Sequence, residues 1–253
     1  MEGAERQDGN MPASPSSSQP LPSFETLLHA ARTGTGPLPR LTLNACRLFL
    51  TLQGPMNVSV FVLDADRNPD ATREPYFQRV DPDETIWHPI SREPLTQPKV
   101  SSILVSVDDL EDFPSVWLDG HEPHAEPDSD DCVFGRLGAE GAGDAEDGDG
   151  EVELLRCCGT DLPREIPPLL VEAAEGPYVT VHDYVAAVHP WLLGLRGNIL
   201  WALNDITEGK PLPAETDLAV GMYGPDSLNI MTEDEWFSDA RSAYKTRGLF
   251  GRG

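Results

Sequence analysis

The sequence contains few basic residues. Lys and Arg number 18 against 43 Asp and Glu, which gives a formal net charge of −25 over 253 residues. Such a charge repels phosphate backbones and anionic lipid surfaces, so we expect no direct binding of nucleic acid or membranes. Four basic residues near the C-terminus are the one cluster that could bind an anionic partner, but four charges are too few to change this expectation. They are Arg241, Lys245, Arg247 and Arg252.

Long apolar runs and a disulfide framework are also missing. No run of about 18 apolar residues occurs, and the N-terminal segment lacks the apolar stretch of a signal peptide. The four cysteines, Cys46, Cys132, Cys157 and Cys158, do not have the spacing of a disulfide scaffold. We therefore expect a cytoplasmic or nuclear protein, where reducing conditions keep these thiols free.

Familiar catalytic motifs are absent as well. The sequence has no phosphate-binding glycine loop, dinucleotide fingerprint, nucleophile elbow, HExxH motif or paired-cysteine zinc spacing. Many folds build their sites from dispersed residues, so this absence does not exclude an enzyme. The sequence assigns no cofactor and leaves open whether the protein is an enzyme.

Composition divides the chain into segments. Residues 1–37 are rich in Ser, Pro and Gly and predict a disordered tail, with a possible short helix over 24–31. A single domain is expected over 38–245 and a short tail over 246–253. Between residues 108 and 153 there are seventeen Asp and Glu against one Arg. We predict a disordered acidic insert at 119–150, dispensable for folding, because its charges repel and few apolar side chains repay ordering.

Apolar patterns predict an α+β fold with a mainly antiparallel sheet packed by a long helix and a C-terminal helix. Strands are expected at 41–52, 57–63, 100–107, 152–157 and 168–172, with a further short strand at 115–118 and an irregular loop over 67–99. The long helix covers 181–204, with a kink or restart at Pro190, and the last helix runs from about 233 to 244. One apolar stripe should be buried: Val181, Val185, Val188, Leu192, Leu195, Ile199 and Leu203.

One segment offers imidazole, carboxylate and thiol groups within twelve residues, a ligand set that zinc can use. Its members are His121, His124, Asp128, Asp130, Asp131 and Cys132. Their spacing fits no standard site, and proline separates the two histidines. We therefore favour a solvated acidic loop over a metal site, and no metal is assigned.

Two further pairs invite a chemical interpretation. Cys157 and Cys158 are adjacent and suggest a redox or nucleophilic site, although buried packing is the commoner role of free cysteine. His182 and His189 lie seven residues apart on the predicted long helix, where an acid–base pair is conceivable. A capping histidine and a half-buried one are the simpler interpretation, because no nucleophile motif accompanies them.

Several short motifs follow one another between residues 85 and 205. They are the segment Pro94–Pro98, the run SSILVSV, the run PSVWL, and PYVTVHDYVAAVHPWL. This order resembles a family of uncharacterised fungal domains with a proline-flanked segment, a Pro-Trp corner and a Val-Thr-Val strand end that opens a helix. Here the tryptophan follows the proline by three residues. The resemblance implies a small α+β domain and no catalytic residues.

The leading hypothesis is a non-enzymatic interaction or regulatory domain that binds an unidentified protein partner. The alternative is a small-molecule enzyme or binding module with a dispersed site near Cys157, Cys158, His182 and His189. A large apolar pocket with convergent polar groups would favour the alternative, whereas a groove or an exposed sheet edge would favour the interaction domain.

Overall fold

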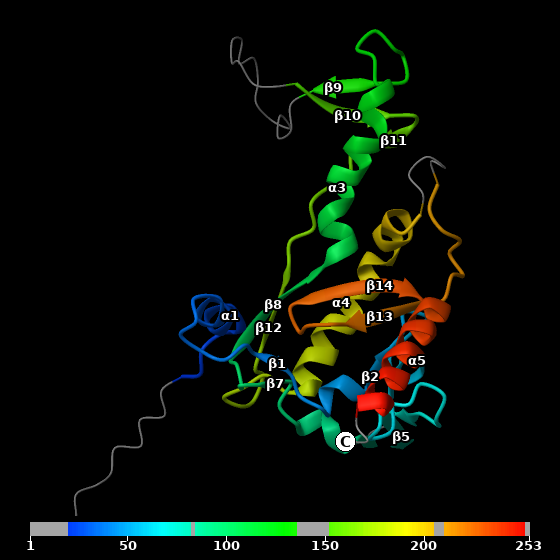
Figure 1. Cartoon of the computed structure of the whole chain (residues 1–253). Coiled ribbons are helices and arrows are strands. Elements are labelled where there is room, and N and C mark those ends of the chain that lie inside the picture. Colours follow the sequence, from blue (N-terminus) through cyan, green and yellow to red (C-terminus); the bar gives the residue numbers. More distant parts are fainter. Residues whose placement is uncertain (1–19, 82–83, 136–151, 205–209, 251–253) are drawn as a thin grey trace, which may run out of the picture.

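The computed structural model describes residues 20–81, 84–135, 152–204 and 210–250, with side chains up to residue 247 (Figure 1). Helices alternate with several mostly antiparallel sheets, which confirms the α+β class. Among these residues, no helix is both long and apolar enough to cross a membrane.

The central sheet has the strand order β12-β8-β14-β13. Its strands are β12 (Leu169–Glu172), β8 (Ser102–Val107), β14 (Ser227–Thr232) and β13 (Leu218–Met222). The β8–β14 pair is parallel, while the other two pairs are antiparallel. Strands β13 and β14 were not predicted from the sequence, although four residues of β13 and three of β14 are buried.

A second sheet of β2 (Leu48–Leu50), β3 (Val60–Val62) and β4 (Glu74–Pro75) continues from the edge of β13. The amide of Leu52 donates to the carbonyl oxygen of Leu218 at 2.9 Å. The strands predicted at 41–52 and 57–63 are longer than the observed ones, because only 48–50 and 60–62 of these ranges pair in this sheet.

Small elements complete the body. The loop expected over 67–99 contains a hairpin, and two short strands pair at the edge of the body. These elements are β5 (Phe77–Asp81), β6 (Glu84–Trp87), β1 (Arg40–Leu41), β7 (Thr96–Gln97), α1 (Phe24–Arg32), α2 (Met56–Ser59), η1 (Ala45–Arg47) and η2 (Pro89–Arg92). Ser23 caps α1, which confirms the short helix predicted there.

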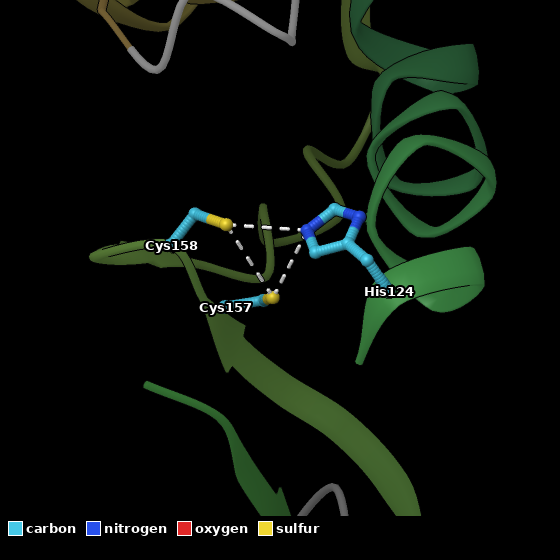
Figure 2. Close-up of side chains that lie close together, drawn as sticks. All are labelled: His124, Cys157 and Cys158. Atoms are coloured by element: carbon cyan, nitrogen blue, oxygen red, sulfur yellow. Dashed lines mark hydrogen bonds between the residues drawn. The ribbon is translucent and has the colours of Figure 1, made fainter. Parts of the chain in front are cut away.

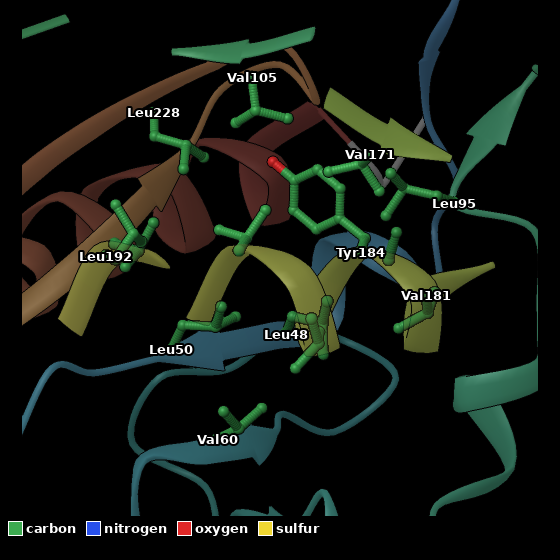
Figure 3. Packing of buried hydrophobic residues seen from close by; sticks show 14 of the residues in the cluster. Leu48, Leu50, Val60, Leu95, Val105, Val171, Val181, Tyr184, Leu192 and Leu228 are labelled. Atoms are coloured by element: carbon green, nitrogen blue, oxygen red, sulfur yellow. The ribbon is translucent and has the colours of Figure 1, made fainter. Parts of the chain in front are cut away.

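Helix α4 (Val181–Ala202) forms the centre of the core. The Thr180 side chain accepts from the Asp183 amide, and the Asp183 carboxylate accepts from the Thr180 amide, so both ends of a capping box are made. Five residues of the predicted stripe are buried, whereas Leu195 and Leu203 are half-buried. Figure 3 shows Tyr184 and Leu192 among side chains of the surrounding strands.

Helix α5 (Glu233–Phe250) covers a separate apolar cluster. The rings of Phe49 and Trp236 lie 4.3 Å apart between centroids, and Phe237 packs against the same phenylalanine at 5.7 Å. The helix extends beyond the boundary predicted for it, so the tail expected from residue 246 is helical as far as Phe250.

An arm, defined as residues 108–135 and 152–162, leaves the end of β8 and extends away from the body (Figure 1). Its helical part is α3 (Asp108–His121) followed by η3 (Glu122–His124). Its sheet has the order β11-β10-β9, made of β9 (Val133–Gly135), β10 (Glu153–Cys157) and β11 (Thr160–Asp161).

Two carboxylates fix the base of the arm. Asp108 accepts from the Ser227 hydroxyl at 2.6 Å, and Asp109 accepts from the Ile230 amide at 3.0 Å. Because both carboxylates occupy the first turn of α3, the direction of this helix is tied to β14. Acidic groups in a first helical turn also interact favourably with the helix dipole.

The structure corrects the predicted disordered insert. Residues 119–135 form the end of α3, η3, a turn and β9, while 136–150 lie outside the described residues. The short strand expected at 115–118 is instead part of α3, which contains Pro114.

Two glycines in α4 allow a test of how this helix is packed in the body. A methyl group added at Gly194 or Gly197 would meet no heavy atom within 4 Å. We expect Gly194→Ala and Gly197→Ala each to raise the free energy of unfolding by about 0.5–1 kcal/mol, because alanine loses less backbone entropy in a helix. Gly221→Ala in β13 is the contrast: its added carbon would lie 3.2 Å from the backbone oxygen of Asn229 and would also displace the end of the Met231 side chain, so stability should fall. Urea unfolding measures all three, and stabilisation by Gly221→Ala would contradict this packing.

Candidate metal centre

Three side chains from different parts of the arm meet at one point (Figure 2). His124 comes from η3, Cys157 ends β10, and Cys158 follows it in a turn. The Nε2 atom of His124 lies 3.2 Å from the Sγ of Cys158 and 3.5 Å from the Sγ of Cys157, and the two sulfurs are 3.8 Å apart. One nitrogen and two sulfurs therefore face a common centre.

A tight turn places the two adjacent cysteines on the same side. Cys157 pairs with Thr160 across β10 and β11, leaving Cys158 and Gly159 as a two-residue hairpin loop. Their φ angles are 52° and 79°, as a type I′ turn requires. Neighbouring side chains alternate in a strand, so this turn is what directs both thiols toward His124.

A fourth candidate ligand comes from the turn before β9. The amide of Cys132 donates to the carbonyl oxygen of Ser129 at 3.2 Å, and its Sγ lies 3.5 Å from that of Cys157. Cys132 is half-buried and lies outside the group of three ligand atoms that are all within 4.8 Å of one another. The sulfurs of Cys132 and Cys157 are not bonded as a disulfide.

These separations match those around a tetrahedral zinc ion. Zn–S bonds of about 2.3 Å and Zn–N bonds of about 2.0–2.1 Å place two sulfurs ~3.8 Å apart and a sulfur and nitrogen ~3.5 Å apart. The measured distances between His124, Cys157 and Cys158 run from 3.2 to 3.8 Å. The donors are imidazole and thiol groups, which suit zinc chemically.

Side chains next to the candidate ligands keep these ligands in place. The Nε1–H of Trp117 donates to the Thr160 hydroxyl at 3.1 Å, and that hydroxyl donates to the carbonyl oxygen of Cys157 at 2.9 Å. The Nδ1–H of His121 donates to the Trp117 carbonyl oxygen at 2.8 Å, and the two rings stack at 4.3 Å. Such support orients metal ligands before the ion binds.

The arm buries little apolar surface of its own. Its buried cluster consists of Trp117, Leu154 and Cys157, with a few half-buried neighbours. A core of this size cannot supply much stability, and small units of this kind usually depend on a disulfide or a structural metal. An ion joining His124, Cys132 and the 157–158 turn would reinforce the β9–β10 pairing and the Trp117–Thr160 hydrogen bond that already connect these segments.

Burial controls the acidity of the central thiol. It raises the pKa of Cys157 to about 12, and hydrogen bonds to the Cys132 and Cys158 thiols contribute in the same direction. The metal-free thiol is therefore protonated at neutral pH and is a weak nucleophile. Because a metal takes the thiolate, binding at this site must release protons and weaken as the pH falls.

The structure separates the other candidate residues from this centre. Within the loop of the arm, Asp128, Asp130 and Asp131 are exposed, whereas the described ligand group contains none of them.

Both histidines of α4 lie in the body of the domain. The ring of His182 packs on Trp87 at 4.3 Å, and His189 is buried in the core, where burial lowers its pKa. They do not form a site with the cysteines.

No family model, no curated protein and no solved structure matches the chain. The resemblance to fungal domains stays a prediction, and the function has to be inferred from the geometry.

The thiols of the metal-free protein should differ in reactivity. We expect iodoacetamide to modify the exposed Cys158 at neutral pH well before the buried Cys157. Modification of Cys157 should accelerate by about tenfold per pH unit below its pKa, because the thiolate is the reactive form. Mass spectrometry after timed quenching measures both rates. Equal rates at pH 7 would contradict the environment described for Cys157.

Proposed function

We propose that the protein binds one zinc ion through His124, Cys132, Cys157 and Cys158. The observation that carries this proposal is the convergence of one imidazole and two thiols, with a third thiol, that of Cys132, 3.5 Å from the Cys157 sulfur. Acidic residues of the same loop, such as Asp128 and Asp131, add a negative field that favours a cation.

A structural role for the ion fits this donor set. Four protein ligands fill a tetrahedral zinc site and leave no position for a substrate, whereas catalytic zinc keeps one position open. The fourth ligand requires the Cys132 thiol to move toward His124 and Cys158 from its present contact with Cys157. The ion then clamps the turn before β9 onto η3 and the β10–β11 turn.

We further infer that the clamped arm serves a non-enzymatic interaction with a protein partner. The arm projects from the body and exposes three valines: Val116, Val133 and Val152. Each is about half-exposed, in surroundings rich in carboxylates. A partner that carries apolar and basic side chains suits these exposed valines and the carboxylates of the arm. Thiols must be reduced to bind zinc, and they stay reduced in the cytoplasm and nucleus, so the proposed site agrees with either location.

Cobalt substitution tests the metal site directly. We expect the purified full chain to bind one Co²⁺ with thiolate charge-transfer bands and the intense visible bands of tetrahedral cobalt, and to exchange it for Zn²⁺. Cys132→Ser, Cys157→Ser and His124→Gln should each weaken binding by tenfold or more. Cys46→Ser is the matched control, because this half-buried cysteine lies in η1, outside the arm.

The same titration has two further outcomes that decide between interpretations. If Cys132→Ser alone binds normally, the site has three protein ligands and the structural role is rejected. If the wild-type protein shows no cobalt–thiolate bands, the metal proposal fails. Removal of zinc by a chelator should lower the melting temperature of the wild-type protein and leave that of Cys157→Ser unchanged.

Cys158 provides a second, independent prediction. A non-glycine residue at a φ of 52° costs the fold about 1–2 kcal/mol, which glycine avoids. We expect Cys158→Gly to leave the metal-free protein as stable or more stable, and to reduce zinc affinity by tenfold or more. Chemical unfolding with chelator and zinc titration measure the two effects. A variant that is less stable without metal would show that the thiol supports the fold by itself.

A further inference from the structure

A second candidate site lies in the body, on the face covered by α5. A cavity of about 310 Å³ that is open to solvent on one side is lined by residues of η1, β2, β13 and α5. Much of its wall is apolar and is formed by Leu48, Leu63, Val220, Met222, Trp236 and Ala240. Cavities of this size accommodate small organic molecules.

Two arginines stand at the edge of this cavity. Arg67 and Arg247 also line an adjoining cleft of about 580 Å³, so they separate the two spaces. The Nη2 of Arg247 donates to the carbonyl oxygen of Arg67 at 3.3 Å. Lys245 lines the adjoining cleft and adds a third positive charge.

Within the described part of the chain, neither arginine has a carboxylate at ion-pair distance. By contrast, Arg241 on the same helix pairs with Asp70 at 2.7 Å. The protein carries 43 acidic residues, so two arginines that line the same cavity without a carboxylate partner are an unusual arrangement for it. Two acidic residues do line these spaces: Asp239, whose carboxylate accepts from the Tyr223 hydroxyl at 3.3 Å, and Asp66.

The backbone of Arg67 supports a functional role for its side chain. Its φ is 55°, a left-handed conformation that arginine rarely adopts and that asparagine or glycine accepts more readily. The loop holds it there: the Arg67 amide donates to the Asp64 carbonyl oxygen at 3.1 Å, and the Asn68 amide donates to the Asp64 carboxylate at 2.8 Å. Residues in such conformations cluster at functional sites.

We propose that this cavity binds a small organic anion, with its oxyanion head on Arg67 and Arg247 and its apolar body against β13 and Trp236. Guanidinium groups hold carboxylates and phosphates through paired hydrogen bonds. Burial lowers the pKa of Arg247, and the charge of Arg67 lowers it further. A bound anion would offset this repulsion. The proposal does not depend on the metal site.

Four probes define the ligand chemistry by isothermal titration calorimetry: benzoate, phenyl phosphate, inorganic phosphate and benzyl alcohol. We expect one site per chain that takes benzoate or phenyl phosphate, and the tighter of the two identifies the head group. Benzyl alcohol and inorganic phosphate should bind at least tenfold more weakly, and affinity should fall with added salt. If benzyl alcohol binds as well as the anions, or if no anion binds, the proposal is rejected.

Matched variants assign the binding to the two arginines. Arg67→Asn suits the backbone, so the protein should remain folded with an equal or higher melting temperature and lose at least tenfold in anion affinity. Arg247→Gln should lose a similar factor. Arg79→Gln removes the same charge from the exposed strand β5 and should bind normally. Retained affinity in Arg67→Asn, or equal loss in Arg79→Gln, would overturn the proposal.

Discussion

The packing of α4 is the constraint on which the body depends. Its buried apolar residues form one cluster with residues of both sheets, including β2 and β3 from the first quarter of the chain and β12 just before the helix. The Tyr184 hydroxyl lies inside this core and donates to the Pro225 carbonyl oxygen at 2.8 Å, so the hairpin of β13 and β14 is also tied to the helix. Pro190 lies on the exposed side of α4, where water can bind the carbonyl oxygen that the missing proline N–H leaves without a helical partner. The N-terminal strands therefore cannot complete their core until a helix more than a hundred residues later has formed.

The sequence predicted secondary structure well where apolar residues recur at one spacing, either that of a helix or that of a strand. The apolar stripe of α4 and its Thr180 cap were predictable, and so were the strands β8, β10 and β12. The hairpin of β13 and β14 was not, because Gly221 interrupts the first strand, although alternation of Leu228 and Ile230 is visible afterwards. Residues 218–221 of β13 are buried one after another, so this strand lacks the alternation of buried and exposed side chains that identifies a strand.

The candidate metal centre was hidden for a different reason. His124 and Cys132 lie in a stretch whose charge resembles that of a disordered segment, and Cys157 follows them after a gap in which acidic residues predominate. A vicinal pair also lacks the spacing by which zinc sites are recognised. The available signal was the dipeptide Cys158–Gly159 at a place where Asn-Gly usually makes a hairpin turn. Among the described residues, Cys158 and Arg67 are the two non-glycine residues with positive φ, and each lies at a proposed site.

The pairing of β9 with β10 separates the part of the arm that holds the proposed zinc ligands from the connection between Gly135 and Glu153, which can accept inserted residues. Gly135 and Glu153 lie opposite each other in register, so the chain that connects them begins and ends at one place. All four proposed zinc ligands lie outside this connection, before Gly135 or after Glu153. Lengthening a connection between fixed ends costs about 0.6 kcal/mol per doubling of its length. A fluorescent or affinity domain inserted between Gly135 and Glu153 is therefore expected to leave both the body and the ligand geometry in place.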